Sequence, residues 1–552
     1  MNGIRLFSCA FFFAIALSEQ VVSGADPQWV TVVNNGIAVP DDSGKRNFNS
    51  YSQPSVNING MVTFRGRSQG GSGGQPAHGV YYRDMMRVFP VKRLLDRNTV
   101  VPAPNNLDSK FIETPSFPRI DRVSNTIATR ANHKPCWKYL LPDGSETRAG
   151  TTGIYSNAFG LLQASASNLG SVPGFQYFAV PGTTIKFDVF PGSPAVTNSN
   201  SIVVKGNYTD SNGISRTGAY WRNLVPTAIP LFQRPMVTLA DTAITLIPGT
   251  SVKFGSVAPP SAAGNSAVFA GFDNEDNPTL GGLYMTPLGI MRPALKTLVA
   301  IGDQVPGEAM GSRFNKFGEG LSFDGRFMTF WGAWGNETKA IRLECPEDGN
   351  QELIDYCKMM YPDGYLVNVP VHQGIFVMDC LTMKISTVAK TPDDFDDFLF
   401  WNFSGHVPGS EESEEEGEAP RWRSATFAAV SSSIQGFFPV PLVAFKARSG
   451  NMMGVTYQNP IDGIYLLKSI NTSPLSFQTL IETGMDGTRI DPKAVYDHDE
   501  NPATPPLPLP VTAMGIERDG FRGEYLGITA SMGNESDGWA GVYLTRVRTI
   551  LP

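Results

Sequence analysis

Two acidic runs hold the residues best suited to acid–base chemistry. They are Asp393-Asp-Phe-Asp-Asp397 and Glu411-Glu-Ser-Glu-Glu-Glu-Gly-Glu418. Glycosidases act through a pair of carboxyl groups that flank the bond being broken. Asp396 and Asp397 therefore support one hypothesis, an extracellular carbohydrate-active enzyme that uses loop carboxylates. The second run is more typical of a solvated acidic loop, because adjacent like charges repel one another and favour disorder.

Two other loops alternate oxygen-bearing side chains, as calcium sites do. They read Asp273-Asn-Glu275-Asp-Asn277 and Asp497-His-Asp499-Glu-Asn501, and each is followed by Pro. Carboxylate and amide oxygens are the ligands that Ca²⁺ takes in proteins. The sequence thus predicts either a Ca²⁺ site in each loop, at Asp273 and Glu275 and at Asp497 and Asp499, or simple turns before Pro. Neither loop has the Gly and distant Glu of an EF-hand, and no other cofactor is expected.

Aromatic residues are the third group with a candidate binding role. Trp401 and Trp422 lie near the acidic runs, in the part of the chain with the longest irregular segments. An indole exposed on a loop can stack on a sugar ring or a protein surface. We therefore predict Trp401 and Trp422 as ligand-loop residues, whereas the aromatic residues that recur at fixed positions are expected to pack inside the fold.

A degenerate repeat must position these residues, and it occurs seven times. Its clearest copy joins Ala267-Val-Phe-Ala-Gly, Gly282-Leu-Tyr-Met, Leu295-Lys-Thr-Leu-Val-Ala-Ile-Gly-Asp-Gln-Val-Pro-Gly307 and Phe314-Asn-Lys-Phe317. Short β-branched or aromatic runs bounded by Gly, Asn, Asp and Pro predict strands. The second run of the unit follows the pattern Gly-Ile-Tyr and recurs at Gly79, Gly153, Gly218, Gly282, Gly374, Gly463 and Gly541.

The repeat is split between the two termini. The segment Trp29 to Pro40 supplies the last part of a unit, and the segment Glu524 to Val547 supplies the first part. Six whole units and two complementary halves make seven, and a sheet completed from both ends closes a ring and removes free edges. The expected fold is all-β: a seven-bladed β-propeller whose ring is closed by N- and C-terminal half-repeats.

The pattern of Val-Ala-Phe, Gly-Ile-Tyr and Gly-Asp-x-Val-Pro-Gly resembles that of secreted tandem-repeat proteins of the choice-of-anchor type. The resemblance covers essentially the whole chain after its first 25 residues, and the fourth copy matches best. The first three copies have lost the Gly-Asp pair, and the fifth and sixth have lost Val-Pro-Gly. The resemblance implies a β-propeller-like fold and export. It implies no activity.

The beginning of the chain predicts secretion. Residues 1–25 carry Arg5, an apolar run from Leu6 to Leu17, and small residues before Asp26, as in a cleavable signal peptide. The rest, 26–552, is expected to be a single propeller domain with long loop insertions near 340–372 and 405–440. No later run is long enough to span a membrane, and a net charge of −7 argues against nucleic-acid partners.

Four cysteines follow the leader: Cys136, Cys345, Cys357 and Cys380. In an oxidising compartment they allow three pairings, and a bridge between Cys345 and Cys357, which share one insertion, is the prediction. Five Asn-x-Ser/Thr sequons are candidate glycosylation sites: Asn207, Asn336, Asn402, Asn471 and Asn534. Asn207, Asn336 and Asn534 follow a Gly, and each is expected in the exposed loop that joins the first two strands of its repeat.

These observations favour a secreted, non-enzymatic binding or scaffold propeller that recognises a protein or glycan ligand through loops on one face. The alternative is the glycosidase-like enzyme described above. The two differ in one feature that a structure can reveal, namely whether the carboxylates converge in an open site.

Overall fold

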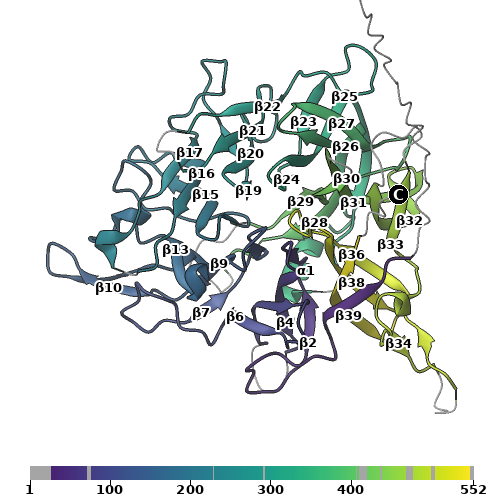
Figure 1. The fold of residues 1–552 in the computed structure, drawn as a ribbon, viewed down its shortest axis with the longest axis horizontal. Coiled ribbons are helices and arrows are strands. Elements are labelled where there is room, and N and C mark those ends of the chain that lie inside the picture. The colour runs from purple at the N-terminus through teal and green to yellow at the C-terminus, as the bar shows by residue number, and fades with distance from the viewer. Residues whose placement is uncertain are drawn as a thin grey trace, which may run out of the picture.

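The computed structural model describes residues 26–70, 76–227, 229–289, 293–347, 349–405, 407–409, 419–435, 438–467, 476–498 and 504–547. Seven antiparallel sheets follow one another around a ring (Figure 1), which confirms the predicted seven-bladed β-propeller. No helix of the described residues is long and apolar enough to cross a membrane.

Each sheet takes its strands in order from the ring axis outward. The first holds β2 (Phe48–Tyr51), β3 (Ser55–Val56), β4 (Met61–Ser68), β5 (His78–Asp84) and β6 (Lys92–Asp96). The second holds β7 (Phe111–Glu113), β8 (Arg119–Ile120), β9 (Ile127–His133), β12 (Thr152–Ser156) and β13 (Gln163–Ser167). The third holds β14 (Ala195–Thr197), β15 (Ser201–Thr209), β16 (Ser215–Asn223) and β17 (Val237–Asp241). The fourth holds β18 (Ser256–Val257), β19 (Ser261–Ala263), β20 (Ser266–Phe272), β21 (Gly281–Pro287) and β22 (Lys296–Ala300).

The last three sheets carry the longest strands. The fifth holds β23 (Phe314–Phe317), β24 (Ser322–Phe323), β25 (Phe327–Leu343), β26 (Tyr365–Asp379) and β27 (Lys384–Lys390). The sixth holds β30 (Ala428–Gln435), β31 (Phe438–Met453), β32 (Thr456–Leu467) and β33 (Phe477–Glu482). The seventh holds β36 (Val511–Gly515), β37 (Phe521–Arg522), β38 (Tyr525–Gly533), β39 (Gly538–Arg546) and β1 (Trp29–Asn34).

Smaller elements lie in the connections. Three hairpins are β10 (Trp137–Leu140) with β11 (Glu146–Ala149), β28 (Phe400–Ser404) with β29 (Arg421–Ala425), and β34 (Val495–Tyr496) with β35 (Leu507–Pro508). The helices are α1 (Gln351–Met360) and the 3₁₀ turns η1 (Ala158–Gly160), η2 (Gln176–Phe178), η3 (Pro230–Phe232) and η4 (Gly487–Arg489).

The ring closes as the split repeat predicts. Strand β1 pairs antiparallel with β39, from Trp29 opposite Thr545 to Asn34 opposite Gly541. The first described strand is thus the outermost strand of the last sheet. Arg83 of the first sheet braces this joint, because its Nη1 donates to the carbonyl of Val32 at 2.7 Å.

The recurring glycines and aromatic residues have one packing explanation. In the fourth sheet the ring of Phe254 packs edge-on against Tyr284, with centroids 5.2 Å apart. A Cβ on Gly271 would lie 2.7 Å from that Phe254 ring, and a Cβ on Gly282 would lie 2.0 Å from the carbonyl oxygen of Val299. Equivalent pairs recur as Phe48–Tyr81, Phe111–Tyr155, Phe187–Tyr220 and Phe314–Phe376. The repeat therefore keeps space for an aromatic ring and for the close approach of the outermost strand.

The inner strands form a second closed circle around the axis. Strands β3, β8, β14, β19, β24, β30 and β37 contact one another in this order, and β37 contacts β3. Apolar clusters fill the spaces between neighbouring sheets, as between the fifth and sixth. Each sheet therefore buries both of its faces against its neighbours.

A charged segment, residues 517–522, follows β36, includes β37 and lies at the axis. Its contacts reach all six other sheets: Val56, Arg119, Ser193, Pro259, Ser322, Phe323 and Val430. Arg518 alone donates to the carbonyls of Ser193 (3.3 Å) and Pro259 (3.2 Å). We call residues 517–522 the axial segment.

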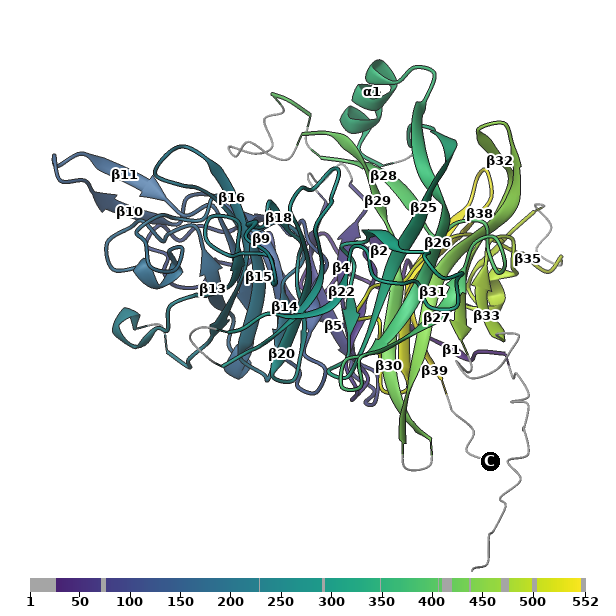
Figure 2. The ribbon, with the colours of Figure 1, turned by 90° about the horizontal axis from the view of Figure 1, so that it is seen from above.

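The long insertions stand on one side of the ring, which we call the crown face. Figure 2 shows α1, the β28–β29 hairpin and the tips of β25, β26 and β32 projecting on this side. The second insertion differs from its predicted bounds near 405–440. It comprises the β28–β29 hairpin, whereas residues 428–435 form the inner strand of the sixth sheet. The sequence places this boundary poorly because β30 does not carry the pattern of the other inner segments.

Candidate functional site

The crown face is built on the overlong hairpin of β25 and β26. Beyond a bulge between Trp334 and Thr338, these strands continue pairing to Leu343 opposite Tyr365. The backbone N–H of Arg342 donates to Val455 of the β31–β32 hairpin at 2.8 Å, which joins the extensions of the fifth and sixth sheets. These extensions raise a shared platform above the ring.

A disulfide closes the tip of this platform. Cys345 and Cys357 are bridged with their Cα atoms 5.8 Å apart, which confirms the predicted pairing. Asn350 caps the helix by accepting from the N–H of Leu353, and α1 buries Ile354 and Cys357. Because a helix of this length is marginal alone, the bridge and the buried face hold it in place. Cys136 and Cys380 are free and buried.

Aromatic rings brace the space between α1 and the β28–β29 hairpin. The ring of Tyr361 lies 5.0 Å from Tyr365, 6.1 Å from Phe403 and 6.5 Å from Trp422. Trp401 and Trp422 are half-buried and pack against the core between the fifth and sixth sheets. The buried Nε1 atoms of both have no hydrogen-bond partner among the described residues. Both predicted ligand residues thus reach the crown face, where they support it from beneath.

The outer surface of the platform is apolar and acidic. Met359 is 68% exposed, Met360 49%, Tyr365 40% and Leu366 56%. Exposed acidic residues lie in the same insertion, which also carries the exposed Arg342 and Lys358: Glu344, Glu347, Glu352, Asp355 and Asp363. We call Met359, Met360, Tyr365 and Leu366 the crown patch. Sequence reasoning missed it, because these residues contain neither tryptophan nor a pair of carboxylates.

The predicted catalytic carboxylate Asp397 is locked inside the protein. It is 1% exposed, and its Oδ1 accepts from Gln373 Nε2 and from the N–H groups of Phe398 and Leu399. Its Oδ2 accepts from the Tyr457 hydroxyl at 3.1 Å and lies 3.4 Å from Lys339 Nζ. Five groups therefore hold this carboxylate as a joint between the fifth and sixth sheets.

The neighbouring carboxylates are less constrained. Asp396 Oδ2 accepts from the N–H of Gly450 at 2.8 Å. Asp394 is half-buried and accepts from the N–H of Lys390 at 3.0 Å. Burial raises the pKa of Asp394, and the charge of Asp393 adds to the effect. A raised pKa is what a general acid requires, so Asp394 is the member of this run with the most suitable chemistry.

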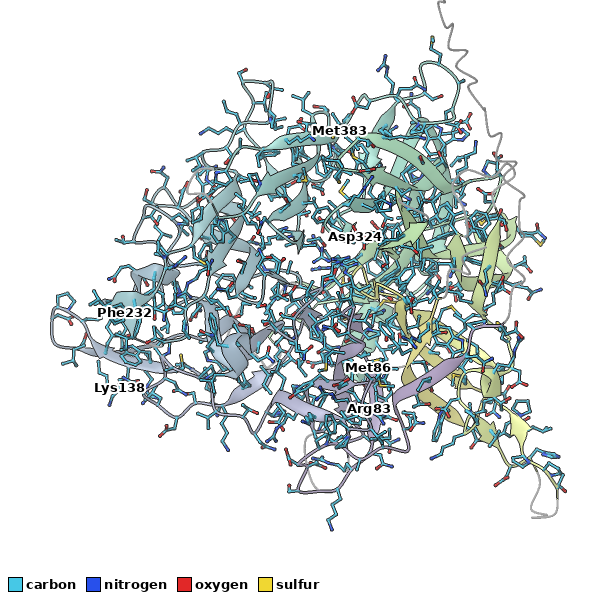
Figure 3. All side chains as sticks on the ribbon, viewed as in Figure 1. Arg83, Met86, Lys138, Phe232, Asp324 and Met383 are labelled. Carbon is cyan, nitrogen blue, oxygen red and sulfur yellow. A yellow bond between two sulfur atoms is a disulfide. The ribbon has the colours of Figure 1, made fainter. Side chains whose placement is uncertain are left out.

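The axis holds a second set of carboxylates, of which Glu517 and Asp519 are paired with arginine. Arg119 Nη2 donates to Glu517 Oε1 at 2.6 Å, and its Nη1 lies 3.2 Å from Asp519 Oδ2. Burial raises the pKa of Asp519, but the guanidinium groups of Arg522 and Arg119 outweigh it and keep that pKa below its usual value. Figure 3 places Asp324 in the same central region. Because Asp519 stays ionised and is bound to Arg119 and Arg522, it lacks a proton to donate.

The two calcium-like loops do not come together as one site in the described residues. Asp273 accepts from the N–H and hydroxyl of Thr279 and from the N–H of Leu280, so its carboxylate closes its own turn. Glu275 is exposed. Asp497 is described, whereas Asp499 lies outside the described residues. No group of three or more His, Cys, Asp or Glu within the described ranges is arranged to hold a metal ion, and the Ca²⁺ site stays a prediction.

Two of the three sequons that follow a Gly do not lie in the loop predicted for them. Asn207 lies inside β15, opposite Thr217, and is half-buried. The loop prediction is wrong for Asn207 and for Asn336, which lies in β25, because both strands run past the Gly-Asn pair. Asn402 is exposed in β28, Asn534 is exposed in the turn after β38, and Asn471 lies outside the described residues.

A serine-nucleophile spacing, Gly66-Arg-Ser68-Gln-Gly70, has no elbow geometry. Ser68 is 2% exposed at the end of β4, where its hydroxyl donates to Gln69 O and accepts from the N–H of Ala77. A nucleophile elbow needs a sharp turn from strand to helix. A second match at residues 70–74 lies partly outside the described residues.

The fold places this protein among seven-bladed β-propellers. No protein-family model and no curated protein matches it. A puromycin-hydrolyzing peptidase of Mycobacterium tuberculosis is 8% identical with a TM-score of 0.38; the match covers 96% of this chain and 57% of the peptidase. A protein solved as a complex with RGII is 8% identical with a TM-score of 0.20, over 56% of this chain and 89% of that protein.

A third similar structure is a GH43 protein, a BlXynB mutant from Bacillus licheniformis. It is 8% identical with a TM-score of 0.18, over 91% of this chain and 98% of that one. These TM-scores are too low to carry an argument, so the function has to be inferred from this protein's own residues.

Proposed function

We propose that this chain is a secreted, non-enzymatic binding propeller that recognises its ligand through the crown face. The observation that carries the proposal is the crown patch, a set of exposed apolar side chains on a platform fixed by a disulfide and by aromatic packing. Exposed apolar patches rimmed by polar residues mark interaction sites. Methionine suits such a surface because its side chain adapts to different partners.

A protein ligand fits this surface better than a glycan. Sugar binding relies on exposed aromatic faces, whereas Trp401 and Trp422 are engaged in packing beneath the platform. The acidic residues around the crown patch, such as Glu352 and Asp355, favour a partner with a basic surface, since charge complementarity steers association.

The experiment is a pull-down with the secreted chain carrying Met359→Glu and Leu366→Glu. Both side chains are exposed, so the fold is expected to survive while binding of a basic partner falls at least tenfold. Phe232→Glu is the matched control. Phe232 is 60% exposed in the β16–β17 connection, which lies at the opposite end of its sheet from the crown face and at the periphery in Figure 3. Equal loss in the control, or none in the double variant, would contradict the proposal.

The enzyme alternative rests on Asp394, whose pKa is raised by burial. It predicts glycosidase turnover that Asp394→Asn abolishes. Turnover lost in that variant, with ligand binding unaffected by the crown-patch substitutions, would replace the binding function with the enzyme.

A further inference from the structure

The face opposite the crown carries exposed apolar side chains of its own. Hairpins such as β25–β26 have their tips on the crown face, so the turns that lead into the outermost strands β6, β13, β17 and β27 lie at the other end of the sheets. Each of these four turns leaves an apolar residue largely exposed: Val88 (102%), Leu161 (74%), Leu231 (85%) and Leu381 (74%). We call these four residues the lower tips.

The lower tips are distributed around the ring and do not form one continuous patch. Figure 3 shows Met86, Phe232 and Met383, which belong to three of the four turns, at widely separated places around the ring. A protein interface is built around one contiguous buried core, so separate anchors of this kind suit it poorly. A lipid bilayer is flat across the whole width of the ring, and each apolar tip can enter its interfacial layer independently.

Basic residues accompany the lower tips. The sequences of the four turns contain no Asp or Glu. Four exposed basic residues lie in these turns or directly beside them: Arg87, Lys92, Arg234 and Lys384. The whole chain has a net charge of −7, and exposed acidic residues outnumber basic ones in the crown insertion. The two faces of the ring therefore differ in charge.

The carboxylates nearest to the lower tips are paired. Asp84 is 21% exposed and lies 3.6 Å from Arg87, and Asp379 is 15% exposed and lies 2.7 Å from Arg326. At the same end of the seventh sheet, the exposed carboxylate of Glu524 lies 3.7 Å from a guanidinium group. These carboxylates are balanced by neighbouring cations, so they do not cancel the basic character of the turns.

Two of the turns are held in place from beneath. In the first sheet, Arg83 Nε donates to the carbonyl of Phe89 at 3.0 Å. In the third sheet, the buried Arg222 donates through its Nε to the carbonyl of Arg234 at 2.7 Å. The lower tips of both sheets therefore project from an ordered backbone, which reduces the entropy lost when they bind.

We propose that the face opposite the crown docks on an anionic lipid bilayer, with the lower tips in the interfacial layer and the basic residues beside the charged headgroups. Charge complementarity carries the choice of an anionic surface, because Lys and Arg close to such a surface are attracted to it. Burial of the apolar tips adds to this attraction. In this orientation the crown face points away from the membrane, so docking leaves the crown patch accessible.

The test is co-sedimentation of the full chain with two kinds of vesicle, phosphatidylcholine alone and phosphatidylcholine with about one third phosphatidylserine. We expect binding at least about tenfold stronger to the vesicles that contain phosphatidylserine, and a weaker preference at high salt. Val88→Glu with Leu381→Glu should weaken this binding at least about tenfold, since it adds two carboxylates to the docking face. The matched control is Leu140→Glu with Met310→Glu, which makes the same change of charge at two exposed residues on the crown side of the ring.

Two further variants decide the outcome. Arg87→Gln with Lys384→Gln keeps the lower tips and should reduce the preference for phosphatidylserine. Met359→Glu with Leu366→Glu, which tests the crown patch, should bind vesicles as the original chain does, so the two functions can fail separately. Absence of binding to phosphatidylserine vesicles, or an equal loss in the tip variant and its control, would overturn the proposal. Self-association without vesicle binding, abolished in the tip variant and measured by light scattering, would also overturn it, because the tips would then join copies of the chain.

Discussion

Arg119 and Glu517 are 398 residues apart in the sequence, and their side chains meet at 2.6 Å on the axis of the ring. The same guanidinium group pairs with Asp519 at 3.2 Å. All three side chains are at most 10% exposed. Taking these charges out of water is costly, so the arrangement is stable only while every partner is present.

Removing Arg119 is therefore expected to destabilise the whole ring. Arg119→Met leaves Glu517 and Asp519 without this partner, and the free energy of unfolding should fall by about 3–5 kcal/mol. Chemical denaturation measures the change. Lys138→Met is the control, because the Lys138–Glu146 pair is 46% exposed on both sides and lies at the periphery in Figure 3; its effect should stay within about 1 kcal/mol. Similar losses in the two variants would show that the axial ion pair is unimportant.

A second prediction follows from the packing of aromatic rings against glycine residues. In Gly271→Ala the new Cβ meets the Phe254 ring at 2.7 Å, and overpacking of this kind costs about 1–3 kcal/mol of unfolding free energy. Adding Phe254→Leu should restore part of the loss by making room. Gly538→Ala is the control, since a Cβ there has no neighbour within 4 Å. Thermal unfolding of the four proteins gives the comparison, and an unaffected Gly271→Ala would contradict the packing argument.

The buried environment of His133 should make the free energy of unfolding depend on pH. Its Nε2 accepts from the Tyr155 hydroxyl at 2.6 Å, with Nδ1 assigned as the donor to the carbonyl of Lys134 at 2.9 Å. Burial lowers the pKa of His133 from 6.5 to about 4, although the Lys134 carbonyl opposes the shift. The unfolded chain therefore takes up this proton at higher pH than the folded one.

The stability that depends on neutral His133 is complete above pH 6.5 and is lost as the pH falls toward 4. The loss at pH 4 is about 3 kcal/mol, from a shift worth 1.36 kcal/mol per pH unit. In His133→Gln, the free energy of unfolding measured by denaturation should fall less steeply between pH 7 and 4, because this contribution is absent. His372→Gln, at a side chain that is 37% exposed, should keep the pH dependence of the original protein. An unchanged pH dependence of the unfolding free energy in His133→Gln would refute the role given to His133.

The disulfide gives a prediction confined to the crown face. Replacing Cys345 and Cys357 by Ser removes a bridge between residues 12 apart, and a loop of that length is worth roughly 3 kcal/mol through the entropy of the open chain. We expect faster hydrogen exchange in α1, with exchange in the seventh sheet unchanged.

Burial raises the pKa of Cys136 and Cys380 to about 12, so neither should react with iodoacetamide at pH 8 while the chain is folded. Labelling of either thiol before unfolding would contradict this expectation.

Repeat positions were predictable from the sequence because local patterns determine them. The run around Gly282 forms β21, and the split repeat correctly pairs Trp29 with the last sheet. The axial segment was not predictable, since Arg518 carries no repeat signature and its partners come from distant sheets. The role of Asp397 was not predictable either, because the sequence named it only as a carboxylate of the enzyme alternative and cannot show that five groups surround its carboxylate.

The position of the axial segment along the chain has a consequence for biosynthesis. Chains generally begin to fold from the N-terminus as they are made, yet β1 has no partner until β39 is complete. Arg518 and Arg522 also leave the ribosome after the carbonyls that they bind, which belong to the third to sixth sheets. The nascent chain must therefore carry unpaired strand edges and an unfilled axis until residues 517–546 have been made, and that one stretch repairs both defects.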